Sequence, residues 1–314
     1  MRSEEVPEEK FLGCLVGNAV GDAIGEIAFR VPDQQELRSY VQQTVKIQYT
    51  DDTAMALGIA EAILSGEGEI DRQGLGEIFR RNYNREPWRG YGPGPPALFR
   101  MVEEEGLDYV EAAGRLFGGE GSMGNGAAMR VAPVGVFYAG TGRVYEMAVR
   151  SAEVTHTHRL GRDGAGVLAT AVAKAALCSP DQKVDATGWA EDLAQTARTE
   201  EFTEAMERVG ELLESGAGRR EAAGRLGTGV LIHRSVPYAV WSFLRAPNSF
   251  EDCLMNAIMA GGDRDTIGAM ACAISGTCLG ADAVAGQWLD RLENGEHIRD
   301  LARGLHKLRS QVTL

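Results

Sequence analysis

Hydrophobic positions recur at helical spacing through most of this chain. Ala, Leu, Met and Glu dominate the periodic segments, while alternating runs of β-branched residues are nearly absent. Residues 45–49 form the one short stretch with the character of a strand. The pattern therefore predicts an all-α protein.

The same periodicity sets approximate bounds for the expected helices. No linker of low complexity divides them, so we expect one domain over residues 1–314. The expected helices span residues 9–26, 52–65, 72–82, 95–105, 108–115, 126–138, 143–153, 163–177, 186–214, 235–244, 250–260, 266–279, 283–292 and 297–308.

Small residues mark one face of the first expected helix. Glycine stands there at every fourth position, at Gly13, Gly17, Gly21 and Gly25. An adjoining row holds Cys14, Asn18, Asp22 and Glu26. Each interior glycine costs roughly 1 kcal/mol relative to alanine, so the row needs a packing reason. The polar neighbours argue against contact with lipid. We predict a buried helix beside a polar site, closely approached by another helix.

Charge and composition narrow the possible partners. The formal net charge is -13, and no basic patch is visible, so nucleic acid is a disfavoured partner. No apolar run approaches the roughly 20 residues of a membrane helix. The acidic start lacks the basic flank and apolar run of a secretory signal. We therefore expect a soluble, cytoplasmic protein with no membrane partner.

The cysteines do not suggest a disulfide framework or a zinc site. They are odd in number, scattered and without a C-x-x-C pair, so we expect small core residues. The five are Cys14, Cys178, Cys253, Cys272 and Cys278.

Two turns rich in carboxylates each precede a helix of small residues. They are Tyr49-Thr-Asp-Asp-Thr53 and Gly261-Gly-Asp-Arg-Asp-Thr266. Thr and Asp are also favoured helix caps, and capping alone would explain the first turn. Helices so rich in Gly and Ala pack closely, however, so both turns could converge in the core. Four unpaired carboxylates would be very costly there, and we expect cations between them.

The candidate metal ligands are all oxygen atoms, which hard divalent ions prefer. They are the carboxylates of Asp51, Asp52, Asp263 and Asp265 and the hydroxyls of Thr50 and Thr266. Two Mg²⁺, with Mn²⁺ as the alternative, would neutralise the four carboxylates. Adjacent Asp51 and Asp52 project in different directions, so each could serve a different ion of a pair.

Three further segments carry weaker signals. The glycine-rich stretch 118–130 exposes backbone amides that can cradle phosphate, although no strand precedes it as in a Rossmann fingerprint. In the stretch 155–161, histidine is commonly a surface or capping residue, and an H-x-H metal pair would lack a nearby third ligand. The Pro- and Gly-rich loop 88–95 predicts a turn that could form a cleft wall.

Taken in this order, these segments resemble the ADP-ribosylglycohydrolase family over nearly the whole chain. The resemblance starts with Gly13-Cys-Leu-Val-Gly17 and Gly21-Asp-Ala-Ile-Gly25, includes both carboxylate turns, and includes Gly121-Ser-Met-Gly-Asn-Gly126. It implies a compact orthogonal multi-helix bundle with a dinuclear Mg²⁺ or Mn²⁺ site in a central cleft. It also implies a glycosidase that hydrolyses the bond between ADP-ribose and a modified protein or small molecule, with ADP-ribose as product.

The resemblance also assigns roles to residues. The metal-ligand positions are Thr50, Asp51, Asp52, Asp263, Asp265 and Thr266. The substrate-binding positions are Gly90, Gly92, Phe117, Gly121, Ser122, Met123, Gly124, Asn125, His156 and Val230. Among these, the 121–125 loop corresponds to the diphosphate and ribose loop, Phe117 to the adenine-stacking aromatic, and His156 to the contact with the distal ribose.

The expected catalytic residues are Asp51, Asp52 and Glu26. Either aspartate could deprotonate a metal-bound water near neutral pH. Members that cleave serine-linked ADP-ribose carry a glutamate where this chain has Phe29, and Glu26 is its possible replacement. This departure leaves open an ADP-ribose-binding protein with little turnover, and the fold leaves open another ribosylated substrate.

Two other positions also depart from the family pattern. Met123 stands where some relatives have an aromatic residue. Arg264 replaces the usual small residue between the two aspartates of the second turn, where it could pair with the excess negative charge of the site.

Overall fold

The computed structural model describes residues 5–179, 183–284 and 286–312. Within these ranges it contains helices and no strand, which confirms the all-α prediction. The α-helices are α1 (Glu8–Arg30), α2 (Gln34–Gln43), α3 (Asp51–Ser65), α4 (Arg72–Arg85), α5 (Gly94–Glu105), α6 (Tyr109–Arg115), α7 (Ala132–Phe137), α8 (Val144–Ala152), α9 (Arg159–Ala176), α10 (Ala186–Thr196), α11 (Glu200–Glu214), α12 (Arg219–Leu226), α13 (Ile232–Arg245), α14 (Phe250–Ile258), α15 (Arg264–Leu279), α16 (Gly286–Leu289) and α17 (Gly295–Arg309). Short 3-10 helices are η1 (Leu116–Gly119), η2 (Asn125–Ala127) and η3 (Ala281–Ala283).

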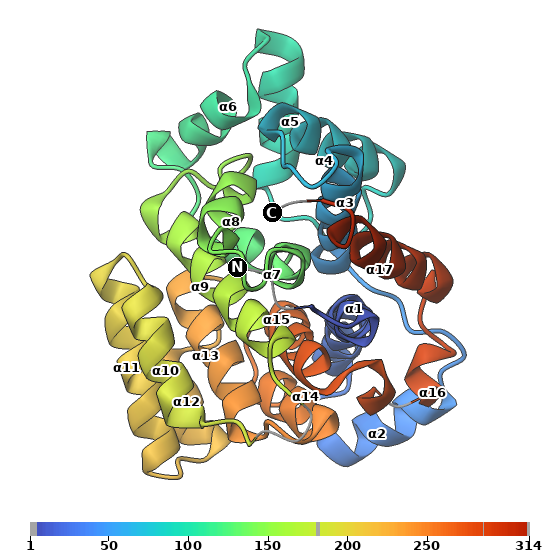
Figure 1. Ribbon diagram of the computed structural model, residues 1–314, viewed down its shortest axis with the longest axis vertical. Coiled ribbons are helices and arrows are strands. Elements are labelled where there is room, and N and C mark those ends of the chain that lie inside the picture. The colour runs from blue at the N-terminus through green and yellow to red at the C-terminus, as the bar shows by residue number, and fades with distance from the viewer. Residues whose placement is uncertain (1–4, 180–182, 285, 313–314) are drawn as a thin grey trace.

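Helices α1 and α15 run antiparallel through the middle of the fold (Figure 1). A Cβ atom built on Gly13 would lie 2.0 Å from the Gly276 carbonyl oxygen, and one on Gly25 would lie 2.6 Å from that of Arg264. The reverse contact is equally tight, because a Cβ on Gly276 would lie 2.1 Å from the Gly13 oxygen. Only glycine allows two helix backbones to approach so closely. The predicted packing reason for the glycine row is therefore confirmed.

Helix α1 is also both long and apolar. By length and composition it meets the criterion for a membrane-crossing segment, which differs from the sequence-based expectation. The fold buries 89% of its most apolar window. A soluble protein's core helix passes the same test, so this finding is weak evidence for a membrane span.

The other helices surround the central pair. Helices α17, α7 and α3 pack against α1, whereas α13, α14 and α9 pack against α15. Figure 1 shows α10 and α11 side by side at one edge and α5 and α6 at the far end. The buried apolar side chains form one cluster that includes four of the cysteines, and Cys178 lies partly buried at its margin.

The expected helix over 186–214 is wrong, because the chain breaks it into α10 and α11. The carboxylate of Asp163 in α9 accepts hydrogen bonds from the backbone N–H groups of Arg198 at 3.1 Å and Thr199 at 2.7 Å. A buried carboxylate that caps free amide groups favours a new helix start over a continuous helix. Periodicity along the chain does not reveal a partner from another helix.

The expected helix over 126–138 is also wrong in its first half. It consists of η2 and the short helix α7, with Pro133 in the first turn of α7. Proline has no N–H group and disfavours helical geometry in the residue before it. Pro133 was therefore a signal in the sequence that indicated this break.

Several smaller elements differ from expectation. Helices α2 and α12 were not predicted, and α2 is preceded by the N-cap Asp33, whose side chain accepts from two backbone N–H groups. Helices α9 and α13 begin earlier than expected. The strand-like stretch 45–49 forms no strand, and its one bridge is the parallel pairing of Ile47 with Leu292. Of the expected helix over 283–292, residue 283 ends the 3-10 helix η3, residues 286–289 are α-helical, and residue 285 lies outside the described residues.

Candidate active site

A buried carboxylate in α1 holds the start of α3. Asp22 accepts hydrogen bonds from the backbone N–H of Thr50 at 3.0 Å and from its hydroxyl at 2.8 Å. It also accepts from the N–H of Thr53 at 3.0 Å and from its hydroxyl at 2.6 Å. Asp22 is completely buried. These four donors fix the first turn of α3, and with it Asp51 and Asp52, against α1.

The second carboxylate turn reaches the same end of α1. A Cβ on Gly25 would lie 2.6 Å from the Asp265 Cα, so the start of α15 touches the α1 backbone. The turn itself is anchored by Thr228, whose carbonyl accepts from the Asp263 N–H at 2.7 Å. Gly262 has φ +75°, and a Cβ there would lie 2.1 Å from that carbonyl, so the turn requires glycine.

The electrostatics show that the two turns converge. Burial, then the charges of Asp22 and Asp263, raises the pKa of Asp51 to about 7. Burial, followed by Asp263 and Asp22, raises the pKa of Asp265 to about 8. The pKa of Asp52 lies well above its usual value for the same reasons, with burial first and Asp22 next. The charges of the carboxyl groups from α1, α3 and α15 therefore interact with one another.

The donor set fits a hard divalent cation. Asp52 Oδ1 is buried and has no hydrogen-bond partner among the described residues, while Oδ2 lies 3.0 Å from the Thr50 hydroxyl oxygen, whose single proton is donated to Asp22. A buried, unpartnered carboxylate oxygen needs a proton or a cation. Oxygen donors without nitrogen or sulfur suit Mg²⁺, Mn²⁺ or Ca²⁺. No three His, Cys, Asp or Glu side chains among the residues described form a ready-made ion cage.

A buried cation that the sequence analysis did not single out is Arg130. Its guanidinium carbon lies 4.6 Å from the centre of the Phe79 ring, and the side chain is 1% exposed. Burial lowers the pKa of Arg130 to about 9, and the charge of Asp51 opposes that shift. Arg264 instead donates to the Ile258 carbonyl at 2.8 Å, so the structure gives no support to its expected pairing with the acids.

The glycine-rich loop folds over the histidine segment. Gly121 has φ +73°, and a Cβ there would lie 2.3 Å from the Thr157 hydroxyl oxygen, so only glycine fits. The Ser122 hydroxyl accepts from the Gly124 N–H at 3.1 Å and closes the loop. The chain therefore turns tightly at residues 121–124.

Asn125 joins this loop to the second carboxylate turn. Its Nδ2 donates to Asp263 Oδ2 at 2.6 Å and to the Ser235 hydroxyl at 3.2 Å. Its backbone N–H donates to the Val230 carbonyl at 2.9 Å. The Ile232 N–H donates to the Met123 carbonyl at 3.0 Å, completing a short pairing. The structure thus brings together two segments that the sequence analysis expected to share a site.

Three expected substrate contacts are exposed apolar side chains. Phe117 is 56% exposed and has φ +53°, Val230 is 61% exposed, and Met123 is 41% exposed. Exposed aromatic and aliphatic groups of this kind suit contact with a base or another apolar ligand surface. Phe117 precedes the glycine-rich loop, and the other two flank the short pairing described above.

A hollow of about 520 Å³ opens beside the acids. Glu26, Thr50, Gly90 and Asp265 are among its lining residues. Gly90 is also close to Asp51, since a Cβ there would lie 3.7 Å from Asp51 Oδ1. Phe29 is 47% exposed and is not part of the lining. The carboxylate that faces the hollow from this end of α1 is therefore Glu26.

The nearby loop carries two more of the expected residues. The Asp51 N–H donates to the Arg89 carbonyl at 2.8 Å, so the residue before Gly90 is bonded to the start of α3. A Cβ on Gly92 would meet no described atom within 4 Å, which places this glycine at an open part of the loop.

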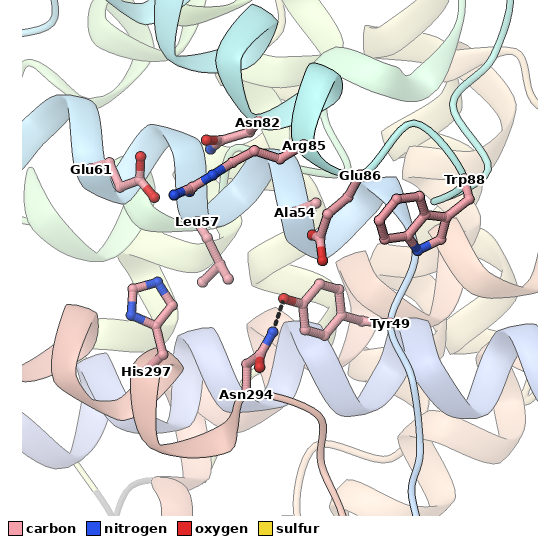
Figure 2. A pocket seen from close by; sticks show the side chains of 10 residues that line it. All are labelled: Tyr49, Ala54, Leu57, Glu61, Asn82, Arg85, Glu86, Trp88, Asn294 and His297. Atoms are coloured by element: carbon pink, nitrogen blue, oxygen red, sulfur yellow. Dashed lines mark hydrogen bonds between the residues drawn. The ribbon is translucent and has the colours of Figure 1, made fainter.

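A second hollow of about 380 Å³ is also lined by Tyr49 (Figure 2). It shares Tyr49 and Trp88 with the first and contains none of the candidate metal ligands. Figure 2 shows Asn294 beside the Tyr49 hydroxyl, to which it donates at 2.9 Å. We assign the candidate active site to the first hollow, because Glu26 and two of the candidate metal ligands, Thr50 and Asp265, line it.

The two histidines of the H-x-H segment serve different neighbours. His156 Nδ1 lies 2.6 Å from the Thr155 hydroxyl, whereas His158 Nδ1 accepts from the Leu160 N–H at 3.1 Å and caps α9. The two Nδ1 atoms thus have different partners, and no group of three or more His, Cys, Asp or Glu in the described part of the chain is placed to hold a metal, so the structure does not support the alternative of a paired metal site.

Comparison with known proteins decides the family. A family model described as ADP-ribosylglycohydrolase matches residues 3–313. The chain belongs to the ADP-ribosylglycohydrolase family. The human (Homo sapiens) ADP-ribosylhydrolase ARH3 is 33% identical, in an alignment that covers 95% of this chain and 93% of the human protein. The zebrafish (Danio rerio) ARH3 is 32% identical, with 95% and 90% covered.

A solved structure supports the same assignment. An "ADP-ribosylglycohydrolase-related protein complex" is similar with a TM-score of 0.71 and 25% identity, covering 96% of this chain and 98% of that one. Together these similarities make this member of the family a glycohydrolase.

Sequence reasoning missed three buried polar residues of this glycohydrolase. Asp22 was noted in a helical row but was not assigned to the site, and Thr53 was considered only as part of a turn. Arg130 is the last residue of the glycine-rich segment, and no role was predicted for it. The polar row beside the glycine row was the available signal for Asp22, because a buried charge requires partners.

Proposed function

We propose that this chain hydrolyses the glycosidic bond between ADP-ribose and an acceptor, with Mg²⁺ or Mn²⁺ at the acid cluster. The observation that carries the proposal is the meeting of Asp51, Asp52 and Asp265 with Asp263, which Asn125 links to the glycine-rich loop. The names of the ARH3 relatives support ADP-ribose as the substrate group.

The roles follow from the positions of the residues. Thr50, Asp51, Asp52, Asp263, Asp265 and Thr266 would hold two divalent ions, which supply positive charge and acidify a coordinated water. Asp51 or Asp52 accepts the proton of the attacking water, and Glu26, which lines the hollow together with Thr50 and Asp265, is a helper. The bond at the distal ribose breaks through an oxocarbenium-like transition state.

The substrate-binding roles are proposed on the same basis. The backbone of 121–125 holds the diphosphate and ribose, because exposed amides in a glycine-rich turn bind phosphate. Phe117 stacks on the adenine, and its exposed ring leaves that face free. We further propose that residues 1–314 act as one catalytic domain in the cytoplasm.

The test of this proposal is loss of both ion binding and turnover. The double variant Asp51→Asn with Asp263→Asn should release no ADP-ribose from ADP-ribosylated Arg and Ser peptides under Mg²⁺ or Mn²⁺. Calorimetric titration should show weaker ion binding. Asp185→Asn is the matched control, because Asp185 is an exposed cap of α10. Unchanged ion binding and release in the double variant would refute the proposal.

A binding protein with little turnover is the second candidate, because this chain has Phe29 where related enzymes have glutamate. The lining of the hollow by Glu26 favours turnover instead. Tight binding of ADP-ribose without release from any modified peptide would support the binding function. Release from another ribosylated small molecule alone would show a different substrate at the same centre.

A further inference from the structure

A chain of buried hydrogen bonds leads from Arg130 to His156. The Arg130 guanidinium donates to the Thr155 hydroxyl oxygen at 2.7 Å and to the Ser151 carbonyl at 3.3 Å. The same Thr155 oxygen lies 2.6 Å from His156 Nδ1. Arg130, Thr155 and His156 are 1%, 3% and 7% exposed. None of the roles assigned above explains why a buried arginine should contact this threonine.

The direction of each bond follows from the donors available. A guanidinium can only donate, so the Thr155 oxygen accepts from Arg130. The Thr155 hydroxyl proton must then find its own acceptor, because a buried donor without a partner is costly. His156 Nδ1 is the one acceptor within hydrogen-bond distance that the described residues offer to this hydroxyl. Thr155 therefore donates to Nδ1, which cannot carry a proton.

The geometry points to a tautomer lock: we propose that Arg130 and Thr155 hold His156 as the neutral Nε2–H form. Nε2 then presents one fixed hydrogen-bond donor to the bound ligand. The proposal deepens the proposed function and rests on it for the identity of that ligand. Arg130 and Thr155 are positioning residues, since they act through His156.

The ring faces the glycine-rich loop, where a ligand oxygen would lie. A Cβ on Gly126 would lie 2.9 Å from His156 Cε1 and 3.1 Å from Nε2. Nε2 has no hydrogen-bond partner among the described residues, in contrast to Nδ1. Its acceptor must therefore come from the ligand or solvent, and a ribose hydroxyl or ring oxygen has the required lone pair.

Burial and a nearby positive charge keep the His156 ring neutral. Burial, and then the nearby Arg130, lowers the pKa of His156 to about 3. Arg130 also acts on the charge of Asp51 across the site. One buried cation thus connects the acid cluster with the loop that contacts the sugar.

The first arm of the test reads the tautomer directly in the full chain without ligand. Histidine labelled with ¹⁵N should show the His156 Nδ1 as an unprotonated nitrogen and Nε2 as a protonated one at pH 7. Thr155→Val should shift His156 toward the Nδ1–H form or a mixture, and Thr155→Ser should restore the original pattern. A protonated Nδ1 in the unmodified chain would overturn the proposal.

The second arm measures binding of ADP-ribose by calorimetry. Thr155→Val should weaken binding about tenfold, the size of one lost hydrogen bond, and Thr155→Ser should restore it. Thr277→Val is the matched control, because Thr277 is equally buried and donates to Ala273 within α15. Unchanged binding by a folded Thr155→Val variant would also overturn the lock.

The two arms separate failure of the lock from failure of the proposed function. If the unmodified chain does not bind ADP-ribose, the proposed function fails, while the ¹⁵N spectra still decide the tautomer. If Thr155→Val does not fold, the ¹⁵N pattern of the unmodified chain and of Thr155→Ser decides the proposal.

Discussion

Single buried polar residues position the catalytic elements of this glycohydrolase. Asp22 accepts from four donors of Thr50 and Thr53 at the start of α3. Burial raises the pKa of Asp22 to about 6, although each of these hydrogen bonds favours the ionised form. The Asp22 carboxylate therefore loses its hydration and gains hydrogen bonds that fix the positions of Asp51 and Asp52.

The Thr53 hydroxyl tests this role without removing the charge. Thr53→Val should lower the free energy of unfolding by about 2 kcal/mol, because a charged carboxylate loses a buried donor. Turnover should fall as well, since the first turn of α3 moves. Urea denaturation with activity assays measures both effects. Thr53→Ser should restore them, and Thr170→Val, whose hydroxyl donates within α9, should have little effect on either.

Glu26 is the candidate replacement for the glutamate that related enzymes carry where this chain has Phe29. Glu26→Gln should lower kcat by roughly 10²-fold with little change in KM, because it removes a proton-transfer group without altering shape. Steady-state kinetics on a cleaved peptide measures this. Glu9→Gln, exposed at the other end of α1, is the control. An unchanged kcat in Glu26→Gln would leave the two aspartates as the remaining catalytic candidates.

At the scale of elements, the pairing of α1 with α15 determines where the two carboxylate turns lie. Their glycines bring the backbones into direct contact, and the start of α15 lies at the end of α1 that carries Asp22. A larger side chain in this contact would separate the helices and move the turns apart. The small-residue rows are thus a requirement of the active site as well as of packing.

Gly17→Ala tests the contact between these helices. Its Cβ would lie 2.3 Å from the Cys272 carbonyl oxygen, so we expect unfolding to become easier by about 3 kcal/mol. Gly224→Ala is the matched control, because it lies exposed in α12 with no atom of the described residues within 4 Å of the new Cβ. Alanine there should stabilise the helix by up to about 1 kcal/mol. Equal stabilities of the two variants in denaturant would contradict the contact.

For the whole molecule, clustered negative charge is the main electrostatic feature. The formal net charge of -13 adds to the local repulsion among the carboxylates of α1, α3 and α15. Arg130 is the buried cation whose charge acts on Asp51. Divalent cations would relieve this repulsion without any change in the fold.

The pH dependence of the metal-free chain follows from these pKa values. Burial and mutual repulsion raise the pKa of Asp51 to about 7 and of Asp265 to about 8, from 3.8. The folded state therefore binds more protons than the unfolded state between about pH 4 and pH 8, so stability falls as pH rises through this window. Thermal unfolding in EDTA should show a lower Tm at pH 8 than at pH 5.

Added cation should reverse this trend. Mg²⁺ or Mn²⁺ should raise Tm more at pH 8 than at pH 5, because ionised carboxylates bind the ion and protonated ones do not. The double variant Asp51→Asn with Asp263→Asn should lose most of this gain. An equal gain at both pH values, or none at either, would contradict cation binding at the acid cluster.

The sequence by itself determined the helical class and the chemistry of the candidate site. Both follow from local information: periodicity reports which residues face a core, and the two aspartate turns contain only oxygen donors. The glycine row likewise predicted a close helix contact, which the structure confirms with α15. These properties depend on residues within a few positions of one another.

Tertiary structure alone decided which distant residues meet. The bonds of Asp22 to the start of α3, of Asn125 to Asp263, and of Asp163 to the start of α11 each join separate elements. Spacing along a chain carries no record of such partners. Burial then makes each bond necessary, because a polar group removed from water must find its partner within the fold.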